Sequence, residues 1–112
     1  TLKSDRKKMQ RIVTNLLENA IKYTPANGTV AVSAAAQNGE IRIDFEDTGV
    51  GISETDLPQI FERFYRCDRS RSQGGVGLGL SLVKAYTKSI NGTIQVESTL
   101  NQGSRFALRF LR

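Results

Sequence analysis

The sequence predicts an α+β fold: a two-layer α/β sandwich in which about three helices cover one face of a mixed, mostly antiparallel sheet. Two long segments carry apolar residues at the spacing of helices that pack on one side. Asn-Gly pairs separate shorter segments whose apolar and polar residues alternate, which indicates strands joined as hairpins. The chain has 112 residues, enough for a core of its own, so we expect residues 1–112 to form a single domain.

The first helix is expected to begin at Ser4 or Asp5, since either side chain can cap a helix N-terminus. Pro25 ends it, because proline cannot continue the helical hydrogen bonds. The polar opening TLKSDRKK suggests a cut from a longer protein rather than a natural leader. The residues on the apolar side of the helix are Met9, Ile12, Val13, Leu16, Leu17, Ala20 and Ile21.

Two strands are expected next, joined at Asn38-Gly39, a dipeptide typical of tight hairpin turns. Apolar residues alternate with smaller or polar ones in both, which predicts one buried face and one solvent face for each strand. The alternating apolar residues are Val30, Val32 and Ala34 in the first strand, and Ile41, Ile43 and Phe45 in the second.

The second half of the chain repeats this alternation of helix and strand. Ser53 can cap a short helix that runs toward Phe61, and the charged stretch 66–75 is expected to be a mobile loop. A second long helix then ends at Asn91-Gly92, and two final strands are joined near residues 101–103. Their apolar residues are Leu78, Leu82, Val83, Tyr86 and Ile90 in the helix, and Ile94, Val96, Phe106, Leu108 and Phe110 in the strands.

Composition narrows the classes of function. The chain has no histidine, which excludes histidine-based acid–base catalysis, histidine metal sites and a histidine phosphoacceptor within these residues. Its one cysteine, Cys67, permits no internal disulfide and suits a reducing compartment. No apolar run reaches the length of a membrane span, so we expect no membrane contact by this domain. The net charge of +5 fits either a mildly basic soluble domain or an anionic partner.

A polar stripe on the first helix is the first candidate site. At 3.6 residues per turn, Asn19 lies about 40° and Lys22 about 20° from Asn15, away from the apolar side, with Tyr23 between the two faces. An ordinary solvated face is the alternative, but such faces favour Glu and Lys over Asn. An Asn oxygen suits a magnesium ion whose other ligands are waters and phosphates, and Lys22 can meet a phosphate charge.

Three further motifs carry polar groups or glycines at suggestive places. In DTGVGI, Asp47 directly follows a strand, where its carboxylate can accept a hydrogen bond from an exocyclic amine such as that of adenine. Gly49 and Gly51 permit close backbone approach, although ordinary turns also contain such glycines. GGVGLGL, residues 74–80, resembles a helix start whose bare amides hold phosphate, or a hinge. FERFYR, residues 61–66, mixes aromatic residues with arginines.

In their order along the chain, NLLENAIKYTP, DTGVGI, FERFYR and GGVGLGL, with GSRF near the end, resemble the catalytic ATP-binding domain of bacterial sensor histidine kinases. That domain has the Bergerat ATP-binding fold, shared with DNA gyrase, mismatch-repair ATPases and large chaperones. The resemblance covers nearly the whole chain and implies ATP and Mg²⁺ as ligands. It departs at Val76, where a threonine or serine is common, and at Ser104, where threonine is usual.

The resemblance implies a role for each matching position. Asn19 would bind the metal with support from Asn15, and Asp47 would accept the adenine amine. The segment from Cys67 to Gly75 would be the ATP lid. The implied catalytic residues are Asn15, Asn19, Lys22, Arg63 and Arg66. The implied nucleotide-binding residues are Asn19, Lys22, Tyr23, Asp47, Gly49, Gly51, Ile52, Phe64, Tyr65, Gly75, Val76, Gly77, Leu78, Gly79, Leu80 and Ser104.

The resemblance also implies the reaction. The γ-phosphoryl group would pass to a histidine on upstream dimerisation helices of a longer, cytoplasmic part of a membrane-bound sensor kinase, and then to a response regulator. Relatives that hydrolyse ATP carry a glutamate base at position 15, whereas this chain has Asn15, which predicts slow hydrolysis. The alternatives are an ATPase or serine kinase of the same superfamily and a degenerate docking module. A nucleic-acid partner is disfavoured, because the basic residues are spread over several elements.

Overall fold

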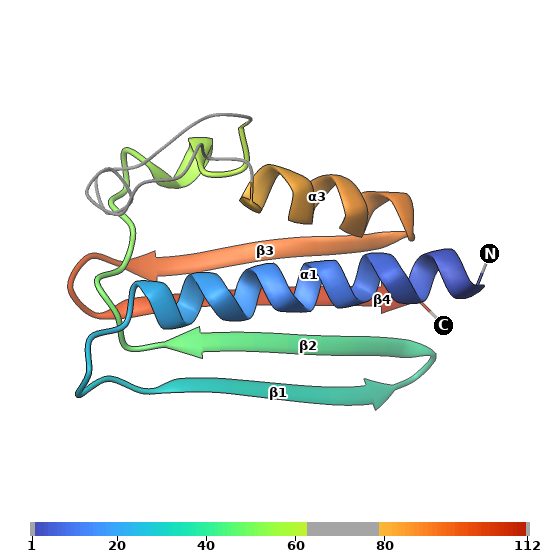
Figure 1. The fold of residues 1–112 in the computed structure, drawn as a ribbon, viewed down its shortest axis with the longest axis horizontal. Helices are drawn as coiled ribbons and strands as arrows, with labels where there is room; N and C mark the ends of the chain where they lie inside the picture. The colour runs from blue at the N-terminus through green and yellow to red at the C-terminus, as the bar shows by residue number, and fades with distance from the viewer. Residues whose placement is uncertain (1, 63–78, 112) are drawn as a thin grey trace.

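The computed structural model describes the backbone of residues 2–62 and 79–111, and the side chains of residues 6–62 and 79–111. Two helices lie side by side on one face of a four-stranded sheet (Figure 1). The elements are α1 (Leu2–Lys22), β1 (Val30–Gln37), β2 (Glu40–Asp47), the 3₁₀ helix η1 (Leu57–Gln59), α3 (Gly79–Ser89), β3 (Gly92–Thr99) and β4 (Gly103–Leu111). The predicted two-layer sandwich is confirmed.

The sheet has the strand order β1-β2-β4-β3, and all of its described pairs are antiparallel. Both predicted hairpin turns form. Asn38 and Gly39 have positive φ between β1 and β2, and positive φ also occurs at Asn101, between β3 and β4, and at Gly103, the first residue of β4. These are conformations that asparagine and glycine adopt most readily. The central strands are therefore β2 and β4, and both lie under the helices.

The core lies between the helices and the central strands. Residues of α1, α3 and the sheet that are almost fully buried meet there, as their apolar spacing predicts: Ile12, Leu16, Phe45, Val83 and Leu108. Phe61, the first residue of FERFYR, packs against this cluster, so part of that motif contributes to the core. This core holds α1 and α3 next to each other.

Two helix predictions need correction. Helix α1 begins at Leu2, before the predicted caps at Ser4 and Asp5, because leucine and lysine at positions 2 and 3 are good helix formers. The expected third α-helix is only the 3₁₀ helix Leu57–Gln59, in which Pro58 lies at the start. Ser53 does act as a local cap, since its Oγ accepts the backbone N–H of Asp56 at 3.2 Å. The described residues thus contain two α-helices instead of about three.

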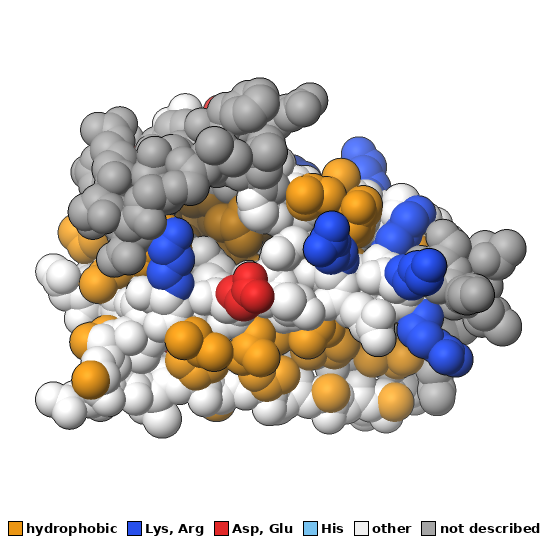
Figure 2. All heavy atoms as spheres, in the orientation of Figure 1, with side chains coloured by type: hydrophobic (Ala, Val, Ile, Leu, Met, Phe, Trp, Pro, Cys, Tyr) orange, Lys and Arg blue, Asp and Glu red, His pale blue; other side chains and the backbone are white. Residues whose placement is uncertain are grey.

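The prediction of a buried face on β1 is wrong. β1 is exposed at every residue after Val30. Val32 and its register partner Phe45 share the helix side of the sheet, yet Val32 is 48% exposed and Phe45 only 1%. The reason is position, since α1 packs over β2 and α3 over β3, which leaves the edge strand β1 uncovered. Figure 2 shows this uncovered apolar strip beside α1, where Ile21 is also exposed.

The predicted loop at 66–75, with Cys67, lies outside the described residues. Within the described part of the chain, neither helix is both long enough and apolar enough to cross a membrane.

Candidate functional site

The polar stripe of α1 forms as predicted and lies on a different side of the helix from the residues that face the core. Asn15 and Asn19 are half-buried, whereas Glu18 and Lys22 are exposed. No described residue makes a hydrogen bond to either asparagine carboxamide. Two carboxamides with no assigned protein partner, one turn apart on a helix, remain available to a ligand or a metal ion.

Lys22 and Tyr23 mark the end of this stripe. Tyr23 is buried, and the Lys22 Nζ lies 5.4 Å from the centre of its ring, within the range of a cation–π contact. The backbone oxygen of Tyr23 accepts the Val50 N–H at 3.1 Å. The C-terminal end of α1 is thereby tied to the DTGVGI loop, residues 47–52.

Asp47 is the buried carboxylate of the site. It ends β2, is 8% exposed, and its Oδ1 accepts the Gly49 N–H at 2.9 Å. Its Oδ2 accepts no hydrogen bond from the part of the chain that the structure describes. The carboxylate is therefore fixed in orientation by one oxygen and keeps the other as an acceptor.

The two glycines of the loop have a packing role that the sequence did not reveal. A Cβ on Gly49 would lie 2.3 Å from the Tyr23 carbonyl oxygen, and one on Gly51 would lie 2.2 Å from the Thr99 carbonyl oxygen. Gly51 also has a φ of +71°, where other residues are strained. The close approach that these glycines permit is to the protein's own backbone, on both sides of the loop.

The far end of the loop is held by the β3–β4 hairpin. The Asn101 N–H donates to the Val50 carbonyl oxygen at 2.7 Å, and the buried Ile52 donates its N–H to Ser98 Oγ at 2.7 Å. Ser104 is 5% exposed, and its Oγ lies 2.8 Å from the same Ser98 oxygen. Ile52 and Ser104 were predicted from the sequence, but Ser98 was not. Its position two residues after Val96, on the inward-facing side of β3 that also carries Ile94, could have indicated it.

The start of α3 supplies the remaining described candidates. Gly79 is the first residue of this helix, and a Cβ there would meet no atom of the described residues within 4 Å, while Leu80 packs against the core. The described residues therefore leave the space beside Gly79 free for a ligand. The other candidates lie outside the described residues: Arg63, Phe64, Tyr65, Arg66, Gly75, Val76, Gly77 and Leu78.

The described candidates fall into one connected region. Hydrogen bonds and close contacts join the end of α1, the 47–52 loop and the β3–β4 hairpin, and α3 packs beside α1 (Figure 1). Among the described residues, no group of three or more Asp, Glu, His or Cys side chains could hold a metal ion. The carboxamide oxygens of Asn15 and Asn19 are of the neutral oxygen type that can bind Mg²⁺ together with water and phosphate oxygens.

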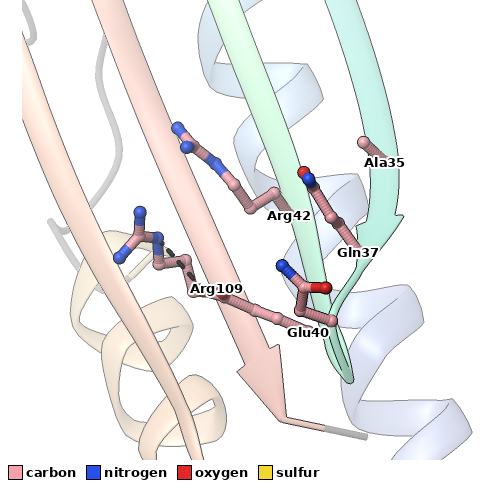
Figure 3. Close-up of a pocket in the computed structure, with 6 residues that line it drawn as sticks. Ala35, Gln37, Glu40, Arg42 and Arg109 are labelled. Atoms are coloured by element: carbon pink, nitrogen blue, oxygen red, sulfur yellow. Dashed lines mark ion pairs between the residues drawn. The ribbon is translucent and has the colours of Figure 1, made fainter.

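A separate hollow of about 230 Å³ lies on the other face of the sheet. Figure 3 shows Arg42 and Arg109 projecting into it from the neighbouring strands β2 and β4, where they are register partners. Arg109 Nε pairs with Glu40 Oε1 at 3.3 Å, and Arg42 lies 3.8 Å from Asp44. This hollow contains none of the predicted site residues, and its arginines each have a carboxylate partner.

Comparison with protein families matches nearly the whole chain to one model. The model is described as "Histidine kinase-, DNA gyrase B-, and HSP90-like ATPase", and it matches residues 4–112.

Curated proteins with similar sequences are longer than this chain. Sensor histidine kinase RppB of Synechocystis sp. is 43% identical over 103 residues, covering 90% of this chain and 23% of RppB. Sensor-like histidine kinase SenX3 of Mycolicibacterium smegmatis is 43% identical over 98 residues, covering 86% of this chain and 26% of SenX3. The chain therefore spans about a quarter of the length of these two relatives.

Solved structures confirm the fold. The mycobacterial sensor histidine kinase MprB superposes with a TM-score of 0.84 at 29% identity, covering 94% of this chain and 72% of that one. Full-length ShkA, solved in complex with AMPPNP, superposes with a TM-score of 0.79 at 32% identity, covering 92% of this chain and 21% of ShkA.

Proposed function

Because the chain belongs to the family of histidine kinase-, DNA gyrase B- and HSP90-like ATPases, we propose that it binds ATP with Mg²⁺ and donates the γ-phosphoryl group to a histidine. The acceptor lies outside these residues, since the sequence contains no histidine. Its place is on dimerisation helices of a longer sensor kinase, in keeping with relatives about four times as long as this chain. A response regulator then receives the phosphoryl group, and the domain works in the cytoplasm beneath a membrane-bound sensor.

The observation that best supports the proposal is the arrangement of Asp47. A buried carboxylate with Oδ1 occupied by the Gly49 N–H and Oδ2 open offers one directed acceptor. The exocyclic amine of adenine is a donor, so an adenine base satisfies this acceptor, whereas the carbonyl at the same place in guanine repels it. Asp47 therefore selects the base.

The stripe of α1 fits the metal and the phosphates. Asn19, supported by Asn15, offers a neutral oxygen to Mg²⁺, which keeps several waters and phosphate oxygens as its other ligands. The exposed Lys22 lies at the same end of the stripe, where its ammonium meets phosphate charge. When bound, Mg²⁺ supplies neutralisation of the charge on the phosphates. Arg63 and Arg66, which lie outside the described residues, are proposed as further cations for the phosphates on the resemblance alone.

Asn15 favours a kinase over an ATPase. A carboxamide cannot take a proton from an attacking water, so Asn15 supports Asn19 at the metal and does not act as a base. The exposed Glu18 lies about 60° from Asn15 around the helix, in a different register. Transfer to a tethered histidine therefore dominates over release of phosphate to water.

The test is a titration of the 112-residue chain with a fluorescent ATP analogue, with and without magnesium. Asp47→Ala is expected to abolish binding, and Asn19→Ala to remove the magnesium dependence. Glu46→Ala, next to Asp47 but on the other face of the sheet, and Gln10→Ala, an exposed carboxamide on the same helix, serve as controls. Unchanged affinity in both site variants would refute this assignment.

A further inference from the structure

Ser98 is a polar residue in an apolar row. It stands on β3 at the inward-facing position that follows Ile94 and Val96, and it is half-buried. A hydroxyl in such a place is costly unless its hydrogen-bonding capacity is used. Neither the proposed chemistry nor the motifs of the sequence assign it a role.

The contacts of Ser98 use its hydroxyl completely. Its Oγ lies 3.0 Å from the Gly103 carbonyl oxygen, which can only accept, so Ser98 donates its proton there. The oxygen then accepts from the Ile52 N–H at 2.7 Å and from the Ser104 hydroxyl at 2.8 Å. One donor and two lone pairs are all satisfied, which is the full capacity of a serine hydroxyl.

These contacts connect Ser98 to the loop that carries Asp47. Ile52, the last residue of that loop, is buried, and Ser98 Oγ is the acceptor of its N–H. At the other end of the loop, the Gly49 N–H holds Asp47 Oδ1. The register also places Ser98, Ser104 and Asp47 in one row across β3, β4 and β2, on the same face of the sheet.

The position of the loop end depends on the Ser98 hydroxyl. Ser98 Oγ accepts the N–H of the buried Ile52, and Ser104, its other hydroxyl neighbour at 2.8 Å, is the register partner of Asp47. Loss of the Ser98 hydroxyl removes the acceptor of the Ile52 N–H and the hydrogen-bond partner of Ser104, so the loop loosens and Asp47 is held less firmly.

We propose that Ser98 is a positioning residue for nucleotide recognition, which fixes the 47–52 loop and with it the orientation of the Asp47 carboxylate toward the base. This inference rests on the proposed function, since it assumes that the base binds at Asp47. It adds a role in specificity to Ser98, whose Oγ accepts the Ile52 N–H and so joins β3 to the loop.

The experiment measures competition of ATP and GTP against a fluorescent ATP analogue on the 112-residue chain. Ser98→Ala is expected to weaken ATP binding about tenfold, the scale of a lost hydrogen bond to a buried group, and to lower the preference for ATP over GTP. Ser98→Thr keeps the hydroxyl and should restore both quantities. Ser33→Ala, an exposed serine on the edge strand, is the matched control and should bind like the wild type.

The outcomes separate this inference from the proposed function. If the wild-type chain fails to bind ATP, the proposed function itself is refuted. If the wild type binds and Ser98→Ala binds equally well with the same base preference, only the inference on Ser98 is refuted. A fall in affinity for ATP and GTP by the same factor, with a lower thermal midpoint, also overturns it, because a purely structural role predicts that result.

Discussion

At the scale of single residues, Asp47 has two oxygens with different tasks. Oδ1 accepts the Gly49 N–H, and Oδ2 accepts no hydrogen bond from the described residues, which leaves it for a ligand. This division could not be read from the sequence, which shows only an aspartate after a strand. The alternating apolar residues of β2 and the glycines after it indicated where Asp47 lies. Which of its two oxygens stays open depends on how the 47–52 loop folds back onto Asp47.

Substitutions of Asp47 can separate these two tasks. Asp47→Asn keeps an oxygen for the Gly49 N–H but turns a donor toward the adenine amine, so ATP affinity should fall at least tenfold with little change in stability. Asp47→Ala also leaves a buried N–H without its acceptor and should lower the free energy of unfolding by about 1–3 kcal/mol. Thermal unfolding and nucleotide titration measure the two effects. Equal stability of the two variants would contradict the role given to Oδ1.

The glycines differ from one another in what they accommodate. Gly51→Ala should destabilise the fold by about 1–3 kcal/mol or more, because its φ is +71° and a Cβ would meet the Thr99 carbonyl oxygen. Gly79 is the first residue of α3, and a Cβ there would meet no atom of the described residues within 4 Å, so Gly79→Ala should leave stability unchanged or slightly higher. If a phosphate approaches Gly79, this second variant should nonetheless bind ATP more weakly. Denaturant unfolding and ATP titration of both variants check the contrast.

At the scale of elements, the long helices and the hairpins were predictable because their signals are local. The apolar spacing of α1 and the two asparagine-containing turns depend only on nearby residues, and the structure has all of them. The exposure of β1 was not predictable in this way. Alternation shows that a strand has an apolar side, but its place in the order β1-β2-β4-β3 decides whether a helix covers that side.

A pair of truncations tests this account of the sheet. Val32 and Phe45 are register partners on the same face, yet only Phe45 lies in the core. Phe45→Ala should lower the free energy of unfolding by about 3–5 kcal/mol. Val32→Ala should cost less than about 1 kcal/mol, because an exposed side chain loses little on truncation. Similar losses for the two variants, measured by urea unfolding, would show that β1 is covered in solution.

At the scale of the whole molecule, the chain belongs to a family of ATPases and histidine kinases but lacks a histidine that could accept a phosphoryl group. It contains no histidine and carries Asn15 where a base is needed for hydrolysis. Phosphoryl transfer depends on positioning, and a tether to the acceptor supplies most of that positioning. The domain alone should thus hold ATP without consuming it, which suits a module that acts only when a sensor brings its acceptor close.

The rate of ATP hydrolysis by the isolated chain tests whether it binds ATP without hydrolysing it quickly. We expect a turnover well below about 1 s⁻¹, under the usual range for enzymes. Asn15→Glu introduces a carboxylate base and should raise the rate, whereas Asn15→Gln adds none and should not. Rapid hydrolysis by the unmodified chain, measured as released phosphate, would favour the ATPase alternative.

The family could be recognised from the sequence because its motifs are short and occur in a fixed order. The contacts that hold the 47–52 loop in place could not be predicted. Ser98 and the Tyr23 carbonyl hold the 47–52 loop through contacts between residues far apart in the chain. Such contacts leave no local pattern. The sequence therefore indicated candidate residues for a nucleotide site, and the structure shows which residues hold the loop that carries Asp47, Gly49 and Gly51.

The most direct measurement is a crystal structure of the chain with a non-hydrolysable ATP analogue and magnesium. We expect the adenine amine to donate to Asp47 Oδ2 and the Asn19 carboxamide oxygen to coordinate the metal. A nucleotide bound elsewhere, or one whose base makes no contact with Asp47, would contradict this expectation.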